Sequence, residues 1–169
     1  MPQTLIVILR ILHIASGAIW FGAIIVVTYF LMPSITALGP AGGQVMKQMV
    51  DRKYPQFMMA LMGITILSGV ALMWWSSAGF SAQWMASRLG QTLSLGAALA
   101  IGAAFFGTVF ARPAMMRMQK IAADIQGGAP TTEQGAEMKK LQAKMAMSTK
   151  IVAILMILAA AAMASARYM

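Results

Sequence analysis

Four long apolar runs dominate this chain. Of its 169 residues, 60% are hydrophobic and only 10% are charged. A helix needs about 20 mostly apolar residues to cross the hydrocarbon core of a bilayer. The chain has four runs of this kind, at about 5–32, 56–75, 89–111 and 148–166. The sequence therefore predicts an all-α, polytopic membrane protein, with one membrane domain over 1–169 folded as a four-transmembrane-helix bundle.

The ends of these runs carry their own signals. The first run is expected to stop at Pro33, because proline cannot easily continue a helix. The fourth is the shortest, and the residues "MAMST" before Lys150 can lengthen it while that lysine extends toward the interface. The first run is predicted to remain in the protein, since "MPQT" lacks the basic residues of a signal peptide and Arg10 interrupts the apolar stretch.

The cations predict the orientation. Most of them lie in the connection after the first run and in the connection before the fourth: Lys47, Arg52, Lys53, Arg112, Arg117, Lys120, Lys139, Lys140, Lys144 and Lys150. Basic connections stay in the cytoplasm, so both termini are expected outside, in a bacterial inner membrane. The formal charge of +9 then reflects topology. The bilayer is the expected partner, and nucleic acid is not.

The connection before the fourth run is long enough to have its own structure. The segment "RPAMMRMQKIAADIQ" is expected to extend the third helix, with a bend at Pro113, and "GGAP" to break it. Thr131 and Gln134 then fit a capping box that opens a helix leading into the fourth run. We predict a cytoplasmic helical hairpin over about 112–147, whose charged face is either solvated or docks a partner.

The acidic residues limit the chemistry. All four of them, Asp51, Asp124, Glu133 and Glu137, lie in the basic connections, so no run contains the carboxylate of an intramembrane proton relay. The sequence has no cysteine, no glycine-rich phosphate loop and no evident catalytic triad. Hydrolase and ATPase activities are poorly supported. Whether the protein is an enzyme stays open, and no catalytic residue is identified.

The only histidine lies in the first run, within "LRILHIASGAIWFGA". His13, Gly17 and Trp20 recur at helical spacing and share a face. A b-type haem needs an imidazole nitrogen for its iron, space beside a small residue, and cations for its propionates. His13 is therefore a candidate metal ligand, Gly17 could supply the space, and Trp20 could pack on the ring edge. Arg10 and Arg88 both lie toward the outer side, which suits propionate binding.

The second iron ligand is not evident. The haem would be five-coordinate, or it would take a methionine such as Met73, Met85 or Met163. A lone histidine in a membrane helix can also simply bond a neighbouring helix, where a small residue such as Gly17 allows close approach. Both readings of His13 stay open.

Methionine and small residues give two further signals. Methionines gather at the cytoplasmic ends of the second and third runs: Met58, Met59, Met62, Met115, Met116 and Met118. Thioethers suit Cu(I), but the same clustering is typical of flexible hydrophobic filler. Small residues four apart predict tight helix contacts, within the chain, in a homo-oligomer or with a membrane-protein partner. These pairs are Ala98/Gly102, Ala103/Gly107 and Ala160/Ala164.

The stretch "LHIASGAIWFGAIIVVTYFLMPSI" resembles the first helix of a loose group of small bacterial membrane proteins. The group includes the copper-resistance D family, the haem-pathway membrane protein described as an oxygen-independent protoporphyrinogen oxidase, and the membrane region fused to some urate oxidases. The segments "DRKYPQFMMALMGITILSGVALMWW" and "WMASRLGQTLSLGAAL" resemble the next two elements. Arg88 stands where the oxidases tend to have lysine. The resemblance covers about residues 5–118.

This resemblance implies a haem-associated redox bundle in which His13 matches the ligand. The chain departs from the pattern between Leu89 and Phe110, where relatives generally carry further histidines, so two histidines cannot ligate the haem. The leading hypothesis is an inner-membrane protein that binds b-type haem through His13 and acts in redox or metal handling. The alternative is a non-enzymatic accessory or structural subunit of a larger membrane complex.

Overall fold

The chain is almost entirely helical, with no strand, in the part that the structure, a computed structural model, describes, which is residues 2–125 and 128–169. Four helices there are long and apolar enough to cross a membrane: Gln3–Ala37, Tyr54–Ser76, Arg88–Ile125 and Thr132–Tyr168. The elements in chain order are α1 (Gln3–Val26), the π-helical turn η1 (Val27–Leu31), α2 (Met32–Ala37), α3 (Pro40–Asp51), α4 (Tyr54–Ser76), α5 (Ala82–Ala86), α6 (Arg88–Phe106), the π-helical turn η2 (Gly107–Ala111), α7 (Arg112–Ile125), α8 (Thr132–Ser165) and the 3-10 turn η3 (Ala166–Tyr168).

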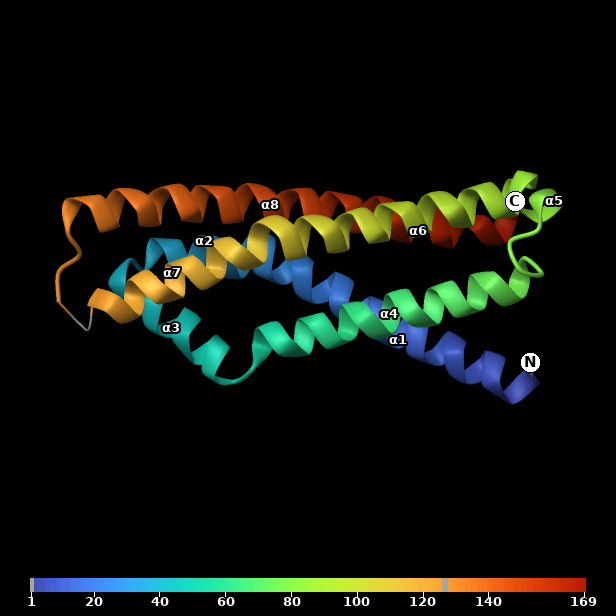
Figure 1. Cartoon of the computed structure of the whole chain (residues 1–169), viewed down its shortest axis with the longest axis horizontal. Helices are drawn as coiled ribbons and strands as arrows, with labels where there is room; N and C mark the ends of the chain where they lie inside the picture. Colours follow the sequence, from blue (N-terminus) through green and yellow to red (C-terminus); the bar gives the residue numbers. More distant parts are fainter. Residues whose placement is uncertain (1, 126–127) are drawn as a thin grey trace.

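The long helices pack as two pairs. α1 packs mainly on α4, and α6 packs mainly on α8, with α7 continuing along the first half of α8. Both termini lie at one end of the molecule, and α2, α3 and α7 lie at the other (Figure 1). α1 runs away from α8 toward the N-terminus. The buried core lies where all four long helices contribute: Trp20, Met58, Leu61, Ala103, Ala104, Val152 and Met156.

The expectation that the first helix stops at Pro33 is wrong, because the helix continues to Ala37. Pro33 lies inside α2, directly after the π-helical turn η1, where the N–H of Met32 bonds the carbonyl of Val27 five residues back. Proline lacks a donor and crowds the preceding turn. A π-helical turn can absorb this irregularity without ending the helix. A π-helical turn also precedes Pro113: η2 ends at Ala111, close to the position where the sequence predicted a bend.

The connection after the first long helix is more structured than the sequence indicated. The chain turns at Gly39, whose φ of 56° lies in the region that favours glycine, and then forms α3. A Cβ on Gly42 would lie 1.9 Å from the backbone oxygen of Ile35. Glycine at position 42 is therefore what lets α3 approach α2 this closely.

The helices α7 and α8 lie side by side beyond the apolar stretches. The predicted capping box is confirmed, since Thr131 Oγ1 accepts from the N–H of Gln134 and Gln134 Oε1 accepts from the N–H of Thr131. Arg117 Nε donates to Glu137 Oε1 at 2.7 Å. This hydrogen bond holds the pKa of the Glu137 carboxyl below its usual value and raises that of Arg117. The predicted break "GGAP" covers residues 127–130: residue 127 lies outside the described residues, and residues 128–130 are not helical.

Candidate functional site

His13 lies at the contact between α1 and α4. Its Nδ1 is 2.8 Å from the backbone oxygen of Thr65. A carbonyl oxygen only accepts, so in this contact Nδ1 carries a proton, and in the neutral form of the ring the lone pair is on Nε2. No hydrogen bond joins Nε2 to any described residue. The contact therefore favours one tautomer of the neutral ring.

Hydroxyl groups continue this polar contact one turn along α1. Ser16 Oγ lies 2.8 Å from Thr65 Oγ1, and both side chains are buried. Each hydroxyl also lies within hydrogen-bond distance of a backbone oxygen of its own helix, that of Leu12 for Ser16 and that of Leu61 for Thr65. A hydroxyl has one hydrogen, so one of the two must turn from its own helix to donate across the contact. Together with His13, these groups form a polar clasp between α1 and α4, which we define as His13, Ser16 and Thr65. Interhelical hydrogen bonds of this kind stabilise helix pairs in a membrane.

Glycines bring the two helices together at the clasp. A Cβ on Gly69 would lie 2.7 Å from His13 Cε1, closer than real Cβ atoms approach. On the other helix, a Cβ on Gly17 would lie 3.3 Å from Thr65 Cγ2. The space beside Gly17 is thus filled by α4, although the sequence had suggested that a cofactor could use it.

The two arginines assigned to this site lie apart from each other. Arg10 is exposed on α1, one turn before His13, and borders a shallow surface hollow with Val7 and Ile14. Arg88 is the exposed first residue of α6, in the α6–α8 pair. Figure 1 shows the start of α6 well separated from the N-terminal half of α1. The structure keeps Arg10 near His13 and does not bring Arg88 there.

The three methionines suggested as second ligands fall on different helix pairs. Met85 Sδ is 3.9 Å from Ser94 Oγ, and Met163 packs against Gly96, so both belong to the surroundings of α6. Met73 is on α4, four residues after Gly69 and therefore on the face that the His13 ring covers. Met73 is the only one of the three on the helix that His13 contacts.

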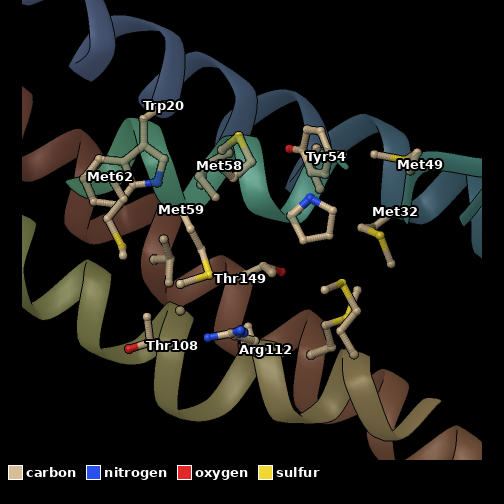
Figure 2. A pocket seen from close by; sticks show the side chains of 18 of the residues that line it. Trp20, Met32, Met49, Tyr54, Met58, Met59, Met62, Thr108, Arg112 and Thr149 are labelled. Carbon is tan, nitrogen blue, oxygen red and sulfur yellow. The ribbon is translucent and has the colours of Figure 1, made fainter. Parts of the chain in front are cut away.

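A second site lies deeper between the helix pairs. A chamber of about 180 Å³ opens there, and α1, α4, α6 and α8 all contribute to its walls. Eight of the 18 methionines line it: Met32, Met46, Met49, Met58, Met59, Met62, Met115 and Met145. We call this space the methionine chamber. Figure 2 shows its sulfur atoms spread along the walls, with Trp20, Thr108, Arg112 and Thr149 among them.

Trp20 belongs to this chamber and not to the His13 clasp. It is only 4% exposed, and Figure 2 shows its indole nitrogen on the side that faces the chamber. Seven residues of helix, about 10 Å, separate it from His13. Because α1 crosses α4, the two residues on one face of α1 meet different neighbours.

The chamber as a whole was missed at the sequence level. The groups around Met58 and Met115 were visible as clusters, but Met46 and Met49 come from α3, which had not been predicted. Met116, from the same sequence cluster, is 56% exposed and points away from the core. The useful signal was the abundance of methionine at the ends of several runs.

The described residues contain no group of three or more His, Cys, Asp or Glu side chains that could hold a metal ion. A metal at either site would therefore need His13, thioethers or an external group as ligands. No family model, curated protein or solved structure matches this chain.

Proposed function

We propose that this chain is a multi-pass protein of the bacterial inner membrane that binds b-type haem through His13 Nε2 and acts in redox or metal handling. The observation that carries the proposal is the hydrogen bond from His13 Nδ1 to the backbone oxygen of Thr65. Metal-bound histidines usually donate their second N–H to such an acceptor, which fixes the tautomer and the ring orientation. The resemblance to haem-pathway membrane proteins supports the same assignment.

Met73 is the proposed second ligand. It lies on α4 beyond Gly69, on the face that His13 covers, whereas Met85 and Met163 pack around α6. It would supply a thioether beside the imidazole of His13, and haem proteins use both of these ligand types.

The residues around His13 meet some of the requirements of a haem site. His13 offers the ligand atom, and Arg10 one turn away offers a cation for a propionate. The space beside Gly17 is filled by the side chain of Thr65, and Trp20 and Arg88 lie away from His13. The proposed haem site therefore does not include these three residues. When bound, haem supplies one-electron chemistry at its iron. The role of the chain is then to hold the imidazole rigidly and to keep the group at the outer half of the membrane.

The orientation is part of the proposal. Both termini lie at one end of the molecule, opposite α3 and α7 (Figure 1). The connections at that opposite end carry most of the lysines and arginines. Basic connections favour the cytoplasm, and this supports the proposed orientation, with both termini and the His13 clasp toward the outer side. The α7–α8 extension then forms a cytoplasmic hairpin.

Absorption spectroscopy tests the haem proposal. The protein is purified in mild detergent from cells supplied with haem, and oxidised and dithionite-reduced spectra are recorded. We expect a Soret band with reduced α and β bands that disappears in His13→Gly and returns when imidazole is added. Met73→Leu should alter the spin state, while the control Met163→Leu should not. A colourless wild-type protein contradicts the proposal.

A second candidate function is that of a non-enzymatic accessory subunit. The His13 hydrogen bond then serves only to join α1 and α4. The specific observation is that Ala160 and Ala164 are exposed one turn apart on α8, which leaves a small-residue face for another helix. Co-purification of a stoichiometric membrane partner from a colourless preparation supports this role. Loss of that partner in Ala164→Leu but not in Ala161→Leu would locate the contact.

A further inference from the structure

We propose that the methionine chamber binds an anionic amphiphile, an aliphatic chain with a negatively charged oxygen head that pairs with Arg112. This site is separate from the His13 clasp and does not depend on haem binding. The argument uses the chamber walls, the unpaired donors that face it, and the position of Arg112.

The walls suit an aliphatic chain. The lining on α1, η1 and α2 extends from Trp20 to Met32, which corresponds to about 18 Å of helix. The opposite wall extends from Ala103 to Met115 over the same number of residues. Most side chains between them are apolar. Methionine is flexible and polarizable, so a lining with eight of them can adapt to a chain of variable shape.

Two hydrogen-bond donors face this apolar space without a partner in the described part of the chain. Trp20 is 4% exposed, and no hydrogen bond joins its Nε1 to any described residue. The indole nitrogen lies on the side that faces the chamber (Figure 2), so a ligand oxygen placed beside it would accept from its N–H. The guanidinium of Arg112 also extends among the lining side chains (Figure 2).

The charge at the chamber is positive and has no ion-pair partner among the described residues. Neither of the two salt bridges between described residues involves Arg112, since these are Lys47–Asp51 and Arg117–Glu137. No Asp or Glu is among the described lining residues. Thr108 and Thr149 direct their hydroxyl hydrogens to backbone oxygens of their own helices. Their hydroxyl oxygens carry no net charge to balance that of Arg112, whereas an anionic head group does.

The position of Arg112 matches the head of an amphiphile. It is the exposed first residue of α7, directly after the apolar stretch of the third long helix. A head bound there stays near the membrane interface, and part of its chain extends into the chamber toward Trp20. Arginine binds carboxylate and phosphate oxygens in a two-pronged geometry, so either head chemistry satisfies it.

A soft metal ion fits the chamber less well. Thioethers are good ligands for Cu(I), but the sulfur atoms are spread along the walls in Figure 2 and do not converge on one point. The uncompensated charge of Arg112 would also repel a cation. The observations therefore favour an anion with an apolar tail, and Cu(I) becomes a competing outcome of the test.

Tryptophan quenching tests the site directly, because Trp20 is the one tryptophan that lines the chamber. The other three are replaced in the full chain by Trp74→Phe, Trp75→Phe and Trp84→Phe. This protein, in mild detergent, is titrated with dibrominated stearate and with its uncharged methyl ester. We expect saturable quenching by the carboxylate and at least tenfold weaker quenching by the ester.

Substitutions at Arg112 then test the head contact. Losing a hydrogen-bonded charge should weaken stearate binding on the order of tenfold in Arg112→Gln. Arg112→Lys, which keeps the charge, should retain most of the affinity. Lys120→Gln is the matched control, because it removes an exposed cation from the same helix outside the chamber and should change nothing. Circular dichroism and elution volume establish that each variant is folded.

Two comparisons of brominated ligands identify the source of the amphiphile. Brominated phosphatidylglycerol that quenches more strongly than brominated phosphatidylcholine assigns the site to an anionic membrane lipid, and selective quenching by stearate assigns it to a free fatty acid. Equal quenching by stearate and its ester, or an unchanged affinity in Arg112→Gln, overturns the proposal. Stoichiometric Cu(I) binding that is lost in Met58→Leu, together with no saturable quenching, overturns it in favour of a soft-metal site.

Discussion

The imidazole of His13 lies against Gly69 so closely that a Cβ on that glycine would be 2.7 Å from His13 Cε1. This contact joins α1 to α4 and, with the hydrogen bond to Thr65, fixes the orientation of the ring. The rigidity of His13 therefore depends on a residue that makes no polar contact with it.

Gly69→Ala should displace the His13 ring. The added methyl group overlaps the imidazole, and overpacking of this kind typically costs about 1–3 kcal/mol. We expect a lower unfolding temperature in detergent, and loss of any His13-dependent haem spectrum. Gly63→Ala is the matched control on the same helix, because nothing lies within 4 Å of its added Cβ. A Gly69→Ala protein as stable as Gly63→Ala would contradict the packing described here.

The Ser16–Thr65 contact should show measurable coupling. A double-mutant cycle with Ser16→Ala and Thr65→Val isolates the interaction between the two hydroxyls, which lie 2.8 Å apart. Interhelical hydrogen bonds in membranes contribute about 0.6 kcal/mol on average and up to about 1.7 kcal/mol. We expect a coupling free energy in this range from reversible unfolding in mixed micelles. Strictly additive effects would mean that the hydroxyls do not interact.

Gly42→Ala should move α3 away from α2. Its Cβ would lie 1.9 Å from the backbone oxygen of Ile35, which cannot rotate away as a side chain could. Because α3 supplies Met46 and Met49 to the chamber, these two methionines should be oxidised faster by peroxide, as measured by peptide mass spectrometry. Gly43→Ala has nothing within 4 Å of the new Cβ and should leave the oxidation rates unchanged.

The Arg117–Glu137 pair should make the α7–α8 contact sensitive to pH. The pKa of Glu137 is lowered in the folded protein by its hydrogen bond from Arg117. The stabilisation is therefore present above the ordinary pKa of the carboxyl and is lost as the pH falls through the lowered value. Hydrogen exchange of α7 amides should rise across that acidic range, after correction for the intrinsic rate. Glu137→Gln should remove this pH dependence, while Glu133→Gln should preserve it.

The sequence predicted the long helices well because an apolar run can be recognised from consecutive residues alone. A run of about 20 apolar residues needs no knowledge of its neighbours, and Thr131 and Gln134 cap a helix through purely local bonds. Pro33 was misleading because its usual effect on a helix was relieved by the π-helical turn before it. That turn has no clear local signature, and α3, which contains two glycines, has only a weak one.

The candidate sites were harder to predict, since they depend on how helices cross. His13 and Trp20 share a face of α1, but one contacts α4 at Thr65 and the other lines the chamber. The methionines of the chamber come from elements far apart in the sequence. Only the tertiary arrangement shows that Met49 and Met145 belong with Met58.

The division of the molecule into α1–α4 and α6–α8 pairs has a consequence for biogenesis. Each pair consists of consecutive long helices, and each satisfies its own close contacts, through the His13 clasp in one and through Gly96 and Met163 in the other. We therefore expect each half to leave the translocation machinery as a finished unit. The walls of the methionine chamber come from both halves, so we expect that site to form only when the two finished units meet.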